Sequence, residues 1–140
     1  MLAHDDDAGN HTAGRPWPVS RQFLDHALRI SERYCRLAEA ERGGGPELVD
    51  FTTEPRCWRT FTTATCTVTL KPDAFVRLGA PRWELRLFLE IDCATEGPTA
   101  LRRQLDLYIR YWQIGTEQSR HEVFPHVVWV VPDERRHSRL

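Results

Sequence analysis

Hydrophobic and polar side chains alternate strictly along residues 84–92, and this alternation is the clearest structural signal in the chain. One set of alternate positions holds Leu85, Leu87, Leu89 and Ile91; the other holds Glu84, Arg86, Phe88, Glu90 and Asp92. A period of two is that of a β-strand with a different environment on each face. Gly79 and Pro81 precede this strand and favour a turn. Residues 71–92 are therefore predicted to form a two-stranded hairpin.

Three carboxylates fall on one face of the predicted hairpin: Asp73, Glu90 and Asp92. If Leu78 lies opposite Trp83 in an antiparallel pair, then Asp73 lies opposite Phe88. Glu90 is then its diagonal neighbour, roughly 7–8 Å away. Carboxylates gathered in this way repel one another unless a cation or a proton intervenes. The pattern therefore indicates a metal site on this face.

Two longer segments carry hydrophobic residues at helical spacing. The first is predicted to start after Ser20 as N-cap and to run to about Arg42, where a glycine run ends it. Its predicted buried stripe is Phe23, Ala27, Ile30, Tyr34, Leu37 and Ala38. The second begins at Pro98 and ends near Gly115. Its predicted buried stripe is Leu101, Leu105, Tyr108 and Trp112.

The remaining strand signals complete the predicted fold. Residues 48–52 predict a first strand, and the threonine- and valine-rich residues 62–70 predict a second that continues into the first arm of the hairpin. Pro72 marks an edge position or a bulge just before Asp73. The apolar run at 127–131 is typical of a strand buried on both faces in parallel pairing. The order helix, three strands, helix, strand predicts a single α/β domain with a mixed sheet flanked by helices.

Composition narrows the classes of function. The 140 residues include 19 basic and 20 acidic side chains, so the net charge is −1. A globally basic nucleic-acid binder is not indicated, although local arginine clusters remain compatible with DNA. The four cysteines form no Cys-x-x-Cys pair, so neither a zinc site nor a redox motif is suggested. No apolar run reaches membrane-spanning length, and we expect a cytoplasmic protein with no membrane partner. Residues 1–18 are predicted to be a flexible tail, and residues 19–140 the folded domain.

From the pattern alone, acidic residues on one strand face are more often exposed to solvent than catalytic. Two details favour a site. Asp73 follows a proline at the strand entry, and Glu90 and Asp92 lie at the C-terminal end of the central strand, where ligands bind in open α/β sheets. On the second helix, Gln104 either orients a water or phosphate or belongs to a partly exposed flank. His26 is interpreted as a packing histidine rather than a ligand.

Several short motifs appear in series from about Ser20 onward. They are FLDHALRISERYCRL with His26, Thr53-Glu54, PDAFVRL from Pro72, FLEID with TE from Phe88 to Glu96, L-x-x-Y at Leu105 and Tyr108, and FP-x-VVWVV from Phe124. In this order and spacing the chain resembles the replication-relaxation proteins of actinobacterial plasmids and mobile elements. That family looks like a divergent branch of the restriction-endonuclease-like PD-(D/E)XK fold, whose core is also helix, three strands, helix, strand.

The resemblance implies roles for the acidic residues. Asp73 takes the place of the PD aspartate and Glu90 that of the second metal-binding carboxylate, with Glu54 completing the shell of one or two Mg²⁺ or Mn²⁺ ions. Asp92 stands where a nuclease has its lysine. In many relatives a lysine appears instead on the following helix, where this chain has Gln104. The catalytic set implied by the resemblance is Asp73, Glu90, Asp92 and Gln104, with Arg102 and Arg103 as contacts to DNA phosphates.

The leading hypothesis is a DNA-processing protein of plasmid or mobile-element replication or transfer, with metal-dependent phosphodiester hydrolysis as its activity. Because Gln104 carries no charge, the sequence favours a degraded catalytic site. The alternatives are a catalytically inactive DNA-binding module and a regulatory domain whose acidic face binds a basic protein partner. Relatives typically carry a winged helix before this domain and a further helix and strand after it. The chain is expected to lack both, and its oligomeric state is left open.

Overall fold

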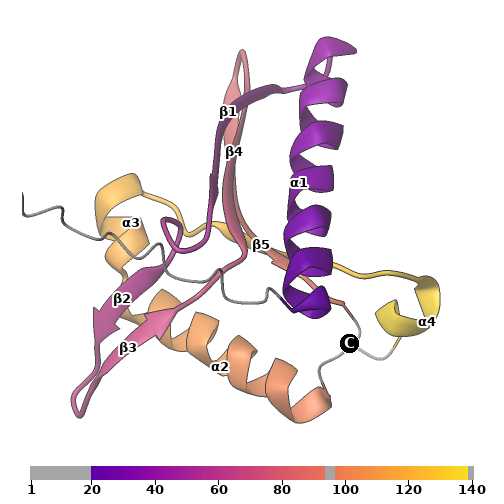
Figure 1. Ribbon diagram of the computed structural model, residues 1–140. Helices are drawn as coiled ribbons and strands as arrows, with labels where there is room; N and C mark the ends of the chain where they lie inside the picture. The colour runs from indigo at the N-terminus through magenta and orange to yellow at the C-terminus, as the bar shows by residue number, and fades with distance from the viewer. Residues whose placement is uncertain (1–19, 94–96, 139–140) are drawn as a thin grey trace, which may run out of the picture.

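Four strands form a mixed sheet at the centre of the structure (Figure 1). Their order is β1 (Glu47–Thr53), β4 (Ala74–Ala80), β5 (Trp83–Ile91) and β6 (His126–Val130). β1 pairs with β4 and β4 with β5 in antiparallel orientation, whereas β6 pairs with β5 in parallel. The predicted mixed sheet, including its parallel last strand, is confirmed.

The computed structural model describes residues 20–93 and 97–138. Besides the central sheet it contains α1 (Arg21–Arg42), β2 (Arg59–Thr62), β3 (Thr67–Leu70), α2 (Pro98–Ile114), α3 (Thr116–His121) and α4 (Glu134–His137). The predicted tail at residues 1–18 lies outside the described residues. None of the described helices combines the length and the apolar composition needed to cross a membrane.

The two long helices cover opposite faces of the sheet (Figure 1). On one face, Ile30 of α1 packs against a cluster formed by Ala74, Val76, Leu89 and Ile91. On the other face, Phe88 packs with Phe75 and with Tyr108 and Tyr111 of α2. Leu89 and Phe88 therefore point to opposite sides, as the period of two predicts. Both sides are buried because each has its own helix, and the result is a single α/β domain with a mixed sheet flanked by helices.

The register of the central hairpin differs from the predicted one by two residues. Leu78 lies opposite Leu85 rather than Trp83, and the turn consists of Pro81 and Arg82 alone. The strand continues through Gly79 because β4 still pairs with β1 there. The shift places Asp73 opposite Glu90 instead of Phe88. The backbone positions of these two acidic residues are therefore closer together than predicted.

Residues 62–70 do not form one strand that continues into the hairpin. β2 and β3 instead pair with each other as a separate two-stranded sheet. Pro72 separates β3 from β4, and β4 is an interior strand of the main sheet rather than an edge. The β2–β3 hairpin packs on the α2 side, where Phe61 and Leu70 join the core around Phe88.

The predicted buried stripes are only partly right. Ser20 caps α1 as predicted, accepting a hydrogen bond from the backbone N–H of Phe23, and Ile30 is buried, but the Phe23 residue is 57 % exposed and Tyr34 is also exposed.

On α2, Leu101 and Tyr108 are buried, but Trp112 is 54 % exposed and Leu105 is also exposed, while Tyr111 is buried instead. The ring centroids of Phe61, in the β2–β3 hairpin, and Tyr111 are 5.1 Å apart, so this contact buries the Tyr111 side of α2.

The apolar run at 127–131 is less buried than predicted. Val127 and Trp129 contact the core on one face, and Val128 and Val130 contact it on the other. All four side chains remain half-buried because β6 is an edge strand with β5 as its single neighbour in the sheet.

Candidate functional site

A cavity of about 400 Å³ opens where β5 ends, between the first turns of α1 and the N-terminal half of α2. This place lies where the N-terminal end of α1 approaches β5 and α2 in Figure 1. The polar residues that line it include Asp73, Glu90, Asp92, Gln104, His26, Lys71 and Cys93. The structure thus gathers all four residues of the predicted catalytic set around one cavity.

Asp73 lies at the entry to β4 and is held by two groups. Its Oδ2 accepts a hydrogen bond of 2.6 Å from the backbone N–H of Ile91, and its Oδ1 lies 3.0 Å from Nε2 of His26. Burial raises the pKa of the Asp73 carboxyl, and the Ile91 N–H and His26 oppose this shift only in part. The Ile91 N–H and His26 therefore do not fully compensate the burial of the ionised Asp73 carboxylate.

Glu90 is only 4 % exposed and accepts a short hydrogen bond from the hydroxyl of Tyr108. Burial, together with the charge of Glu90, raises the pKa of the Tyr108 hydroxyl, so this group remains a neutral donor. The sequence predicted Tyr108 as a core residue of α2 and as part of the L-x-x-Y motif. Its ring does pack on Phe88, and its hydroxyl orients Glu90 at the cavity.

Asp92 has a different kind of partner. Arg136 of α4 donates two hydrogen bonds to it, from Nε and from Nη2, the second with a length of 3.1 Å. The pair is buried and joins the C-terminal helix to the end of the sheet. Nothing in the sequence pattern pointed to Arg136, which is 44 residues from Asp92 and belongs to a four-residue helix.

His26 is hydrogen-bonded and partly buried, and it also lines the acidic cavity, which its interpretation as a packing histidine did not include. Its Nε2 faces Asp73 and lies 3.9 Å from Oε1 of Glu54, and its Nδ1 lies 3.9 Å from Sγ of Cys93. Burial raises the pKa of the Cys93 thiol, which therefore stays protonated. The ring links α1 to the start of β4 and the end of β5.

The predicted DNA contacts Arg102 and Arg103 are both exposed on α2. Neither lines the acidic cavity. Arg102 lines a separate groove, of about 440 Å³, with Leu105 and Trp129.

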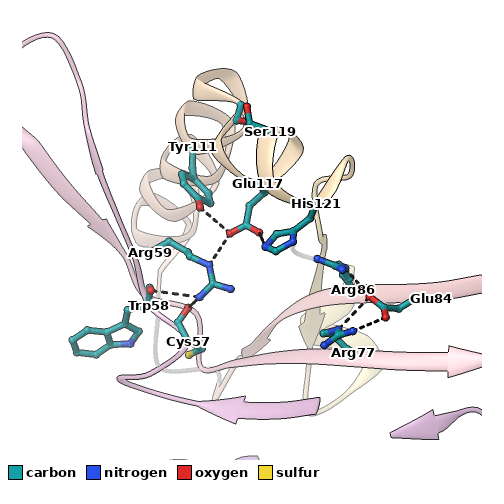
Figure 2. Close-up of polar contacts among 11 residues, drawn as sticks. Cys57, Trp58, Arg59, Arg77, Glu84, Arg86, Tyr111, Glu117, Ser119 and His121 are labelled. Atoms are coloured by element: carbon teal, nitrogen blue, oxygen red, sulfur yellow. Dashed lines mark hydrogen bonds and ion pairs between the residues drawn. The ribbon is translucent and has the colours of Figure 1, made fainter. Parts of the chain in front are cut away.

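A second buried acid, Glu117 of α3, does not line the cavity and was missed by sequence reasoning (Figure 2). Glu117 is 3 % exposed, and its Oε1 accepts hydrogen bonds from Arg59 Nε at 2.7 Å and from the Tyr111 hydroxyl at 2.8 Å. The Arg59 guanidinium also lies over the ring of Phe75, 4.9 Å from its centroid. Glu117 follows Gly115 in a polar segment, where no periodicity indicated burial.

The donor chemistry of the cavity suits a hard cation such as Mg²⁺. Within residues 20–93 and 97–138, no three His, Cys, Asp or Glu side chains are grouped so as to hold a metal ion. Mg²⁺ needs less, because it usually binds one or two carboxylates and fills its other positions with water and phosphate oxygens. Asp73 and Glu90 provide such a pair. Asp92 is already paired with Arg136, and Glu54 contacts His26 at 3.9 Å without lining the cavity.

The class defined by these features is an α/β domain with an acidic cavity at the end of its central strand. A sequence model of the replication-relaxation family matches residues 1–127. The chain therefore belongs to the replication-relaxation family, and the predicted resemblance is confirmed. Membership suggests a role in the processing of replicating or plasmid DNA. No curated protein and no solved structure matches the chain significantly.

Proposed function

We propose that the chain is a DNA-processing module with a core of the PD-(D/E)XK type. The connectivity supports this proposal: α1, β1, β4, β5, α2 and β6 follow one another in the order helix, three strands, helix, strand. The β2–β3 hairpin is an insertion between the first two strands of that core. The acidic cavity lies at the end of β5, where the resemblance implies the metal-binding carboxylates.

One observation carries the proposal of a metal-binding site. Asp73 and Glu90 both line an open cavity, where the titratable ring of His26 contacts Asp73 and Tyr108 donates a neutral hydroxyl to Glu90. Carboxylates held in this way can receive a cation from outside, which Asp92 with its guanidinium partner cannot do as readily. Asp73 and Glu90 would hold Mg²⁺, which would polarise a DNA phosphate and lower the pKa of an attacking water.

The chain's own residues would position the reaction. Tyr108 fixes the rotamer of Glu90, and the Ile91 N–H fixes that of Asp73. Gln104 reaches the cavity from α2 and can donate a hydrogen bond to a phosphate oxygen.

A second candidate function is DNA binding without hydrolysis. It is favoured by Gln104, which stands at the cavity where many relatives carry a lysine. A neutral amide stabilises the developing charge of a phosphoryl transition state less than an ammonium does.

The decisive experiment measures binding and cleavage with the same substrates. The full chain is incubated with plasmid, duplex and single-stranded DNA in Mg²⁺ or Mn²⁺, alongside Asp73→Asn and Glu90→Gln. Glu84→Gln is the matched control, because it removes one carboxylate from the exposed end of the same hairpin. Metal-dependent cleavage that is lost in the first two variants and kept in the control supports the nuclease.

Gln104→Lys separates the two candidates. A gain of cleavage that Asp73→Asn eliminates supports a degraded nuclease site. Metal-independent DNA binding with no cleavage by any variant supports the binding module, and an absence of DNA binding by the wild type contradicts both.

A further inference from the structure

Lys71 is the only lysine in the sequence, whose 18 other basic residues are all arginines. It comes directly before Pro72 and Asp73, and it lines the acidic cavity. Among the lining residues that the structure describes, it is the one side chain with a permanent positive charge. A chain that uses arginine everywhere else thus places its single ammonium group beside its candidate site.

The ammonium group of Lys71 is held without being neutralised. Its Nζ lies 4.6 Å from the centroid of the Trp58 ring, which is a cation–π contact. Within the described residues no carboxylate forms an ion pair with it, although three carboxylates line the same cavity. Trp58 packs against the core around Phe88, so the indole gives the lysine a fixed support. The charge of Lys71 therefore remains available to an anion.

Lysine and arginine would act differently at this position. A guanidinium tends to stack flat on an aromatic ring and presents a planar fork of donors. An ammonium is a compact point charge with three donors, and it can keep its contact with the ring while it binds a phosphate oxygen. A phosphate drawn to a cation on Asp73 and Glu90 would meet Lys71 as the only lysine or arginine among the described lining residues.

We propose that Lys71 binds a DNA phosphate at the mouth of the acidic cavity and supplies the positive charge that Gln104 does not. This inference rests on the proposed function, since it names the residue that receives the substrate of that same site. Trp58 positions Lys71 and does not itself contact the phosphate.

The salt dependence of DNA binding tests this inference. Affinity of the full chain for a fluorescent duplex is measured over a series of salt concentrations in Mg²⁺. Loss of one phosphate contact lowers the slope of log affinity against log salt by about one. Lys71→Gln should show that decrease. Lys71→Arg should keep the slope, which depends on charge, but should bind more weakly because a guanidinium stacks on Trp58. Arg82→Gln, in the exposed turn at the other end of the β4–β5 hairpin, is the matched control and should bind like the wild type.

The sole lysine also allows a direct chemical readout. Acetylation of Lys71, followed by mass spectrometry, should slow when the duplex is bound and recover at 1 M salt, where phosphate contacts are weakened. If the wild type binds DNA but Lys71→Gln keeps its slope and the duplex gives no protection, the inference is overturned while the proposed function stands. If the wild type binds no DNA, the proposed function itself fails.

Discussion

The two buried acidic sites of this domain are built from similar parts, but only Glu90 lines the acidic cavity. Glu117 and Glu90 are equally inaccessible, and each accepts a hydrogen bond from a tyrosine of α2. Glu117 also faces the guanidinium of Arg59, which is itself enclosed by aromatic rings and a backbone carbonyl. A buried carboxylate that is paired with a permanent cation already has its counter-charge and serves a structural role. Glu90 instead lines an open cavity, where we propose that it binds a cation.

The two ends of the β4–β5 hairpin show the same contrast at the surface. At the turn end, Glu84 accepts hydrogen bonds from Arg77 and Arg86, and these partners lower its pKa to about 2 (Figure 2). At the cavity end, burial raises the pKa of Asp73. The direction of the shift therefore separates a surface carboxylate with two guanidinium partners from a buried one whose partners offset its burial only in part.

Breaking the buried Arg59–Glu117 ion pair should have the largest effect on stability. Glu117→Ala leaves Arg59 without its carboxylate and should cost about 3 kcal/mol of unfolding free energy, at the low end for a buried pair because the Arg59 side chain is 22 % exposed. Urea unfolding measures this loss. The double variant Glu117→Leu with Arg59→Met should recover much of it, because no charge is then left unpaired. A loss below about 1 kcal/mol for Glu117→Ala would mean that the buried ion pair contributes no more to stability than a surface pair does.

The cavity should respond to a cation, in contrast to the Glu117 site. Mn²⁺ at a hundredfold excess over its dissociation constant should stabilise the fold by about 2.7 kcal/mol. Asp73→Asn and Glu90→Gln should each abolish this gain, and Glu84→Gln should keep it. Thermal unfolding with and without the ion is the measurement. An unchanged melting temperature at millimolar Mn²⁺ argues for a role without metal.

Tyr108→Phe sharpens the comparison by removing the neutral donor alone. The ring still packs on Phe88, but Glu90 loses a hydrogen bond to a buried charge, which should cost about 2 kcal/mol. Mn²⁺ should restore part of the lost stability, because the ion can then satisfy the same carboxylate. Equal losses with and without the ion would contradict the idea that hydroxyl and cation serve one group.

The smallest effect is expected from acid. The lowered pKa of Glu84 stabilises the fold above its ordinary pKa of 4.5, and this contribution is lost as the pH falls toward about 2. Asp73 acts with the opposite sign, since a raised pKa favours the fold at low pH and the advantage disappears as the pH rises. Unfolding of Glu84→Gln and of the wild type is compared between these pH values in low salt. Curves that stay parallel through this range would show that the Arg77 and Arg86 pairs add nothing.

Much of the fold follows from local patterns, but the partners at the site do not. The period of two between Glu84 and Asp92 predicted both faces of β5 and hence the residues that meet at the cavity. It could not set the register, because a four-residue loop around Gly79 and a two-residue turn at Pro81 fit the pattern equally well. His26 and Arg136 reach the acids across 47 and 44 residues, and such pairings depend on tertiary packing rather than on spacing. Tyr111 of α2 is likewise buried by Phe61, which belongs to the β2–β3 hairpin that the sequence pattern did not predict.

The insertion of β2 and β3 between β1 and β4 also affects the order in which the strands of the main sheet pair during folding. β5 follows β4 after a two-residue turn, whereas Thr53 of β1 must find Ala74 of β4 across the whole inserted hairpin. Closing a long loop costs more chain entropy than closing a short one, and non-local pairings form more slowly. We therefore expect β4 and β5 to pair first, which brings Asp73 and Glu90 together before His26 and Arg136 arrive. The acids of the cavity would meet while water still solvates them, and the surrounding helices would enclose them last.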